Sequence, residues 1–335
     1  MNGGVQAFAQ AWLRQLTRTL IVLLRVMIPV FLLVSIFEAL GWIELAGRWL
    51  AAPLGWIGMG PRAAVALLVG LFAGLYAAIG TMASLGMTPA EALPVVLFIQ
   101  FAHALPMEAS VAHQGGANGW HHALSRLAMG FLAAALAPLL APLAGIDSAV
   151  APAAELAAAS TVATGPQTFG QVLLRSLGDL GETLLLLVAI LAVITLVVQL
   201  LEQSGWLERW SHATAPWMEK VGWTGEAALP LVTGLFVGLI YGAGVMIERF
   251  QKGRLDRRVG REVFLFLGAC HSVLEDPFIF VPLGVGPAVL LPVRLAAGAL
   301  VLLVLAWRHR LGARTAPSMA AGTTADQPGT RTTAL

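Results

Sequence analysis

Long uncharged apolar runs alternate with short polar segments along most of the chain. Thr183 to Leu201 carries no charged residue, and Ala227 to Ile247 and Ala288 to Trp307 carry at most one each. A helix needs about 20 apolar residues to cross a hydrocarbon core about 30 Å thick. The runs lack the strict alternation of barrel strands, so the pattern predicts an all-α polytopic membrane protein.

The same pattern occurs twice. Glu38 to Glu44 recurs as Glu202 to Glu208, and Gly70 to Gly74 recurs as Gly234 to Gly238, both at an offset of 164 residues. After a four-residue insertion the offset becomes 168, and it relates three further pairs: His103 and His271, Glu108 and Asp276, and Arg126 and Arg294. Matches in this order predict a duplicated membrane unit.

Each predicted unit contains a first helix, a Trp- and Pro-containing amphipathic stretch, a glycine-rich helix, a His-containing segment and a last helix. We count four spans per unit, and we assign the glycines to close helix packing. The predicted segments are an N-terminal amphipathic segment (1–18), a first repeat (19–144), a linker (145–171), a second repeat (172–310) and a disordered tail (311–335).

The basic residues indicate how the units are related. The second-unit loop from Arg249 to Arg261 carries six Lys and Arg residues, whereas the matching loop, Gly86 to Ala90, carries none. Both termini are basic and the linker has no Lys or Arg before Arg175. The positive-inside rule then places both termini in the cytoplasm of a multi-pass inner-membrane protein. The repeats are inverted if the Trp/Pro stretch crosses or re-enters the membrane, and parallel if it lies in the interface. We favour the inverted arrangement.

Composition narrows the function. Apolar residues make up 58% of the chain and charged residues 11%, and the formal net charge of +2 gives no reason to expect a nucleic-acid partner. The single cysteine, Cys270, excludes an intrachain disulfide. The chain contains no glycine-rich nucleotide loop, GxSxG elbow or HExxH helix, so we predict neither an enzyme nor a cofactor. The predicted partners are the lipid bilayer and a small-molecule or ion substrate.

The candidate site is a repeated set of a histidine, a carboxylate five residues later and an arginine 18 residues after that. It comprises His103, Glu108 and Arg126 in the first unit and His271, Asp276 and Arg294 in the second, with Glu275 beside Asp276. Ionisable groups at membrane depth usually face a cavity or a partner. Pro106 and Pro277 predict helix breaks beside the carboxylates. In this interpretation Arg126 and Arg294 are the counter-ions of the site carboxylates. The alternative is that the acid–arginine pairs merely neutralise each other and lock the helices together.

A metal site is a weaker interpretation. Cys270, His271, Glu275 and Asp276, completed by His103 and Glu108, offer ligands for a divalent transition ion. However, Cys270 and His271 are adjacent, so on a helix they point about 100° apart. The first repeat also has Ala102 where the second has Cys270.

The stretches Pro53 to Met59 with Leu68 to Gly74, and Pro216 to Gly222 with Leu231 to Gly238, resemble the nucleoside recognition, or Gate, domain. That family includes spore maturation membrane proteins, the permease part of ferrous iron transporters and distant relatives among concentrative nucleoside transporters. The resemblance implies two Gate units and a transporter of a small polar solute, acting alone, as a homodimer or with a related Gate protein. Permeation of a divalent cation and a non-transporting role in membrane assembly stay open as alternatives.

Overall fold

The computed structural model describes residues 2–42, 45, 54–146 and 169–315. These residues form helices joined by turns, and no strand occurs among them. Most of the predicted tail (311–335), nearly all of the predicted linker and much of the first Trp/Pro stretch lie outside the described residues. The prediction of disorder is wrong for residues 311–315, which continue the last helix of the chain.

Three helices of the described chain are long and apolar enough to cross a membrane. They are α1 (Asn2–Ala39), α10 (Phe169–Gln203) and α15 (Pro287–Thr315). The four full-length spans expected per unit are not found among the described residues, where most other apolar segments form short helices that pack in pairs. Apolar side chains on the outer sides of the long helices, such as Leu185 (76% exposed) and Leu303 (68% exposed), have the exposure expected of lipid-facing residues.

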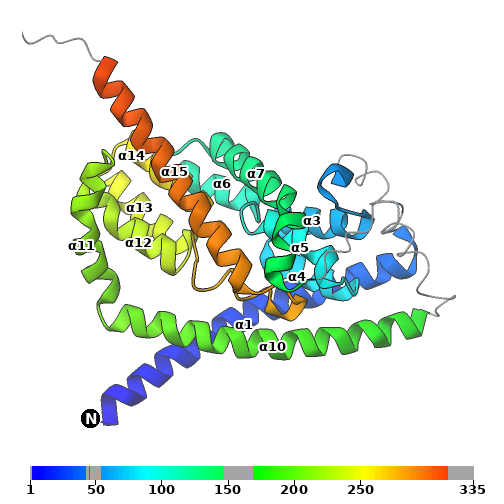
Figure 1. The fold of residues 1–335 in the computed structure, drawn as a ribbon. Coiled ribbons are helices and arrows are strands. Elements are labelled where there is room, and N and C mark those ends of the chain that lie inside the picture. Colours follow the sequence, from blue (N-terminus) through cyan, green and yellow to red (C-terminus); the bar gives the residue numbers. More distant parts are fainter. Residues whose placement is uncertain (1, 43–44, 46–53, 147–168, 316–335) are drawn as a thin grey trace, which may run out of the picture.

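The equivalent helices α1 and α10 cross each other and run in opposite directions (Figure 1). The indole Nε1 of Trp12, near the start of α1, donates to the carbonyl of Ala192 at 3.2 Å and to Oγ1 of Thr195 at 3.1 Å, in the later half of α10. Leu23 and Met27 of α1 and Leu187 and Leu191 of α10 are fully buried in one apolar core. The crossing thus joins the two units through their first helices.

The glycine-rich segments fold back on themselves. In the first unit α3 (Pro61–Ala73) is followed by α4 (Leu75–Ser84), and in the second η3 (Gly225–Ala227) and α12 (Ala228–Phe236) are followed by α13 (Leu239–Gln251). The reversals occur at Gly74 (φ 95°) and Gly238 (φ 135°), at backbone angles that favour glycine. The prediction of one continuous helix per unit is wrong, because these glycines provide turns, whereas Gly70 and Gly234 provide the predicted close packing.

The His-containing segments are also discontinuous. α5 (Pro89–Ile99) is capped by Thr88, and α14 (Arg257–Ala269) is capped by Asp256, 168 residues later. After α5, residues 100–104 form a turn before α6 (Leu105–Gln114); after α14, turns lead to η4 (Val281–Leu283). The predicted breaks are present, but they lie at the histidines. Pro106 occupies the first turn of α6, where its missing N–H leaves no bond unmade.

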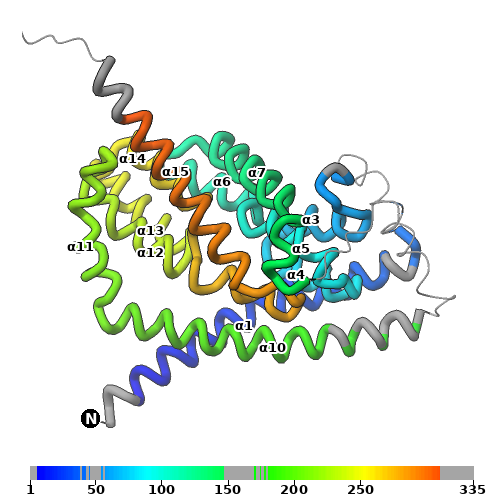
Figure 2. The backbone as a smooth tube through the Cα atoms, in the orientation of Figure 1, coloured from blue at the N-terminus to red at the C-terminus, as the bar shows by residue number. Residues whose placement is uncertain are grey.

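The last helices differ between the units. α15 is continuous, whereas its counterpart consists of α7 (Gly119–Ala135), α8 (Ala137–Leu140) and η2 (Pro142–Ala144), and the chain bends where Pro138 and Pro142 interrupt the expected helix. The remaining elements are η1 (Gly55–Ile57) and α11 (Trp206–Lys220), which packs along the outside of α12 after a sharp corner at the end of α10 (Figure 2).

Two observations indicate that the repeats are inverted. α7 and α15, which begin 168 residues apart, run in opposite directions (Figure 1). The homologous loops before α5 and α14 also lie at opposite ends of α15: Pro89 packs beside Gly284, just before α15 begins, whereas Arg258 contacts His309 near its other end. Two copies of one unit, with the same order of elements and opposite orientations, form the architecture of many transporters.

Candidate functional site

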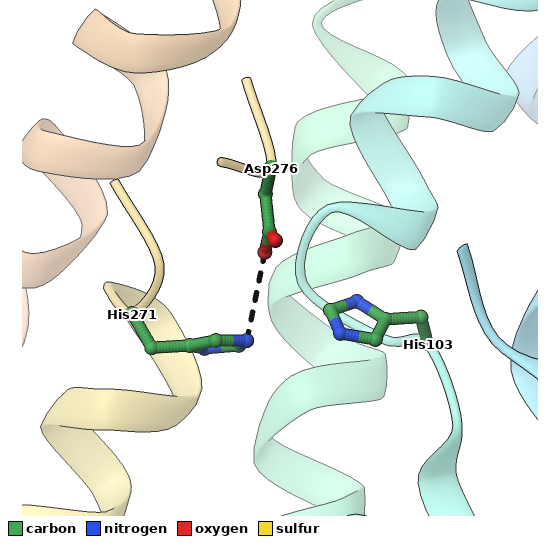
Figure 3. Close-up of side chains that lie close together, drawn as sticks. All are labelled: His103, His271 and Asp276. Atoms are coloured by element: carbon green, nitrogen blue, oxygen red, sulfur yellow. Dashed lines mark ion pairs between the residues drawn. The ribbon is translucent and has the colours of Figure 1, made fainter. Parts of the chain in front are cut away.

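The two helix breaks meet at the junction of the repeats. The imidazole of His103 comes from the turn after α5 and that of His271 from the turn after α14, and their ring centroids lie 5.4 Å apart. Asp276 lies over the gap between the two rings (Figure 3). His103, His271 and Asp276 are 7%, 2% and 5% exposed. These residues are far apart in the sequence, and the inverted fold brings them together in the interior.

Each histidine is held in one orientation by its own helix. Nδ1 of His103 contacts the carbonyl of Ile99 at 2.8 Å, and Nδ1 of His271 contacts that of Leu267 at 2.6 Å. A carbonyl only accepts hydrogen bonds, so Nδ1 carries the hydrogen and Nε2 faces the carboxylates. Nε2 of His103 lies 2.9 Å from Oε1 of Glu108, and Nε2 of His271 lies 3.6 Å from Oδ2 of Asp276. The shorter contact requires a proton between the nitrogen and the oxygen.

Arg126 and Arg294 hold both the carboxylates and the broken backbone. Arg126 pairs with Oε2 of Glu108, and its Nε and Nη1 donate to the carbonyls of Phe101 (2.5 Å) and His103 (3.2 Å). Arg294 Nη1 donates to Asp276 Oδ2 at 2.6 Å and to the carbonyl of His271 at 2.5 Å. The predicted acid–arginine pairs are thus present in both units, and the same guanidinium groups satisfy carbonyls that the end of a helix leaves free.

Arg294 also joins the two units, because its Nη2 donates to the carbonyl of Gln100 in the first repeat. Both arginine side chains are fully buried. A buried ion pair needs further hydrogen bonds to offset the loss of hydration, and the broken backbone supplies them here.

The backbone after each histidine is strained in the same way. Ala104 (φ 45°) and Ser272 (φ 50°) adopt the left-handed conformation, which costs a residue with a side chain about 1–3 kcal/mol. Their N–H groups donate to the carbonyls of Gly70 at 3.0 Å and Gly234 at 3.1 Å. The glycine-containing helix hairpins therefore hold the backbone at both helix breaks. Because the same strained conformation occurs in both units, it belongs to the architecture of the junction.

Two residues of the junction were missed in the sequence. Gln100 is 1% exposed, and neither atom of its amide has a hydrogen-bond partner among the described residues. The hydroxyl of Tyr76 donates to Oε1 of Glu275 at 2.5 Å and so links the two repeats. Neither residue is duplicated, which hid both from a search based on the repeat. The available signals were a lone amide in an apolar run and a tyrosine in a chain that has only two.

The predicted metal set needs correction. Cys270 packs against Gly298 of α15, and Glu275 accepts a hydrogen bond from Tyr76, so neither belongs to the cluster of potential ligands. The described residues with suitable geometry are His103, His271 and Asp276, each with a potential ligand atom within 4.8 Å of the others. Around a tetrahedral ion with bonds of about 2.0–2.1 Å, ligand atoms lie about 3.3 Å apart, so this group needs a small inward movement to hold one.

Comparison with known proteins agrees with the repeat. The profile of a family described as nucleoside recognition, or Gate, matches residues 20–117 and 184–285. The two matched segments begin 164 residues apart and end 168 apart, the offsets found within the sequence. They include both histidines and both paired carboxylates, whereas Arg126 and Arg294 lie just beyond them.

One relative covers most of the chain. The chain is 28% identical over 282 residues to the uncharacterized membrane protein YvoD of Bacillus subtilis (strain 168), which spans 84% of this chain and 88% of that protein. No solved structure shows a significant match to the chain.

Proposed function

Because this chain belongs to the Gate, or nucleoside recognition, family of membrane proteins, we propose that it is a transporter that moves a small polar solute through the junction of its two repeats. The observation that carries the proposal is the meeting of two broken, oppositely oriented segments around His103 and His271, whose rings lie 5.4 Å apart. Discontinuous helices at the interface of inverted repeats are where many secondary transporters bind their substrates.

The polar groups of the junction support binding as well as structure. Paired arginines and carboxylates alone would suffice to lock helices together. The unpartnered amide of Gln100 does not fit that role, because a buried amide without a hydrogen bond costs about 1–3 kcal/mol. A polar solute or water at the junction would satisfy this amide.

In this proposal Glu108 and Asp276 are the coupling or coordinating carboxylates. His103 and His271 contact the solute or exchange protons, and the proton shared by His103 and Glu108 is the group that binding would displace. Arg126 and Arg294 remain counter-ions. The protein would lie in the inner membrane with both termini in the cytoplasm, which the basic loop between α13 and α14 supports.

A divalent cation is the second candidate substrate. It is favoured by the cluster of His103, His271 and Asp276, whose nitrogen and oxygen ligands suit a first-row transition ion. The cation hypothesis differs from the solute hypothesis in the state of the two histidines that it requires. It requires both histidine Nε2 atoms as ligands, so binding would release the proton held between His103 and Glu108.

Uptake into proteoliposomes tests both candidates. The family description makes radiolabelled nucleosides the first probes, followed by Mn²⁺ and Zn²⁺. We expect the Glu108→Gln, Asp276→Asn variant to lose at least tenfold in uptake rate, because the charges at the junction are removed while its shape is kept. The control is the Glu248→Gln, Lys252→Gln variant, which removes an exposed ion pair at the protein surface. Uptake at the wild-type rate by the junction variant would contradict the assigned roles.

The assembly alternative makes a different prediction for the charged pairs. If Glu108 and Arg126 only hold helices together, replacing both by leucine leaves no buried charge, and protein that folds despite losing the donor to the carbonyls of Phe101 and His103 keeps its function. If the junction binds a solute, the same double variant is inactive even in the fraction that size-exclusion chromatography shows to be folded.

A further inference from the structure

A polar cavity lies at the end of the molecule where the basic loop before α14 meets the far end of α15. Its volume is about 360 Å³, and it is separate from the junction of the repeats. α7, α14 and α15 contribute its polar lining, which includes His122, Arg258, Arg261, Glu262 and Arg308.

The positive charge in this cavity is not balanced by its acid. Glu262 is already engaged, since it accepts from Trp223 Nε1 at 2.7 Å and lies 3.0 Å from His309 Nε2 and 3.3 Å from Arg258 Nε. Arg261 and Arg308 form no hydrogen bond or ion pair with any residue that the structure describes. Two guanidinium groups therefore remain available to an incoming anion.

His122 forms the buried side of the same cavity. It is 4% exposed, yet neither ring nitrogen makes a hydrogen bond of normal geometry within the described part of the chain, and the backbone of Phe264 is the nearest candidate partner. Buried polar side chains are almost always hydrogen-bonded, so an exception beside a cavity indicates a missing partner. His122 lies one helical turn before Arg126 on the same face of α7, and it packs beside Gly268 of α14.

The cavity at the equivalent position at the other end of the molecule lacks the arginines and the buried histidine. A cavity of about 370 Å³ lies there between the loop before α5 and residues 282–284. The described residues that line it include one acid, Glu182, and no Lys, Arg or His. The repeat does not reproduce His122 either, because Leu290 stands at the matching position. The positive cavity is thus a specific feature of one end and not a consequence of the duplication.

We propose that this cavity binds an anionic phosphate group, held by Arg261 and Arg308 with His122 as a third hydrogen-bond donor. Arginine suits this ligand because its planar fork pairs with two phosphate oxygens at once. The phosphate belongs either to a small solute or to a lipid head group at the membrane surface. The site does not depend on transport through the junction, so it can be tested separately.

Equilibrium binding of radiolabelled inorganic phosphate tests the site, with the protein in nanodiscs of phosphatidylcholine. Saturable binding is expected, and the Arg261→Gln, Arg308→Gln variant should bind at least tenfold more weakly. The His122→Gln variant should keep most of the affinity, because glutamine retains a donor, whereas His122→Leu should weaken it. The Arg14→Gln, Arg18→Gln variant is the control, since it removes two exposed charges from α1, away from the cavity.

A second series in nanodiscs that contain phosphatidylglycerol identifies the source of the phosphate. Loss of phosphate binding in these discs, by competition, indicates a lipid head group, and unchanged binding indicates a free solute. Absence of saturable binding in phosphatidylcholine, or equal affinity of the wild type and the Arg261→Gln, Arg308→Gln variant, would overturn the proposal. Size-exclusion chromatography confirms that each variant is folded.

Discussion

At the scale of single residues, Arg126 and Arg294 perform two tasks with one guanidinium group. Each pairs with a buried carboxylate, and each donates to carbonyls that a broken helix leaves without partners. The junction can be discontinuous in the interior of the protein because these arginines replace the missing helical hydrogen bonds. They therefore support the site structurally even where they do not contact a solute.

Removal of one arginine alone should be strongly destabilising. The Arg126→Leu variant leaves the carboxylate of Glu108 unpaired and the carbonyls of Phe101 and His103 without a donor. Breaking a buried ion pair from one side costs about 3–5 kcal/mol, so we expect a large fall in the thermal unfolding midpoint in detergent. Arg18→Leu, at an exposed position of α1, should have little effect. Equal midpoints for the two variants would show that Arg126 does not hold the break.

The sequence revealed those site residues that occur twice. The spacing of five from histidine to acid and of 18 from acid to arginine is the same in both units, and the structure contains both pairs. Gln100 and Tyr76 occur once, and their importance depends on contacts between repeats that no spacing within one repeat can indicate. Cys270 looked like a ligand from its neighbours alone, although its side chain faces α15.

At the scale of elements, the two hairpins of short helices are the parts that shape the junction. α12 and α13 pack so closely that a Cβ added to Gly242 would lie 2.6 Å from the backbone of Gly234 and Pro230. The carbonyl of Gly234 also accepts from Ser272 in the break. Gly234 therefore takes part both in the contact between α12 and α13 and in the hydrogen bond that fixes the backbone beside His271.

Two neighbouring glycines allow a matched test of this packing. Gly242→Ala should destabilise the protein by about 1–3 kcal/mol or prevent folding, because its methyl group meets backbone that cannot move aside. Gly244→Ala, one half-turn further along α13, points into open space and should be neutral or slightly stabilising. Fluorescence-detected size-exclusion chromatography with a heating step measures both. Similar behaviour of the two variants would argue against the hairpin.

The sequence located these segments but not their reversals. An apolar run with a glycine every few residues is equally typical of a packed continuous helix and of a hairpin. The difference lies in the positive φ angles of Gly74 and Gly238, which composition does not reveal. The short turns after Ile99 and Ala269 were predicted better, since nearby prolines and charges interrupt the apolar pattern there.

At the scale of the whole molecule, inverted repeats place equivalent loops at opposite ends and the paired breaks between them. The asymmetric distribution of Lys and Arg predicted this arrangement, although the count of spans did not. The long helices α1, α10 and α15 provide the lipid-facing frame, and the short helices enclose the junction. In the described part of the chain, this arrangement buries the polar cluster of His103, His271 and Asp276 between the two units.

Access to Gln100 from both sides of the membrane tests the central claim most directly. Since Cys270 is the only cysteine, Cys270→Ser yields a background in which Gln100→Cys is the single thiol. Inside-out and right-side-out vesicles are then treated with a membrane-impermeant thiol reagent. A transporter should be labelled at this buried position in both orientations, at rates that change when a transported solute is added. Labelling from neither side, with full reaction after denaturation, would contradict a transport route through the junction.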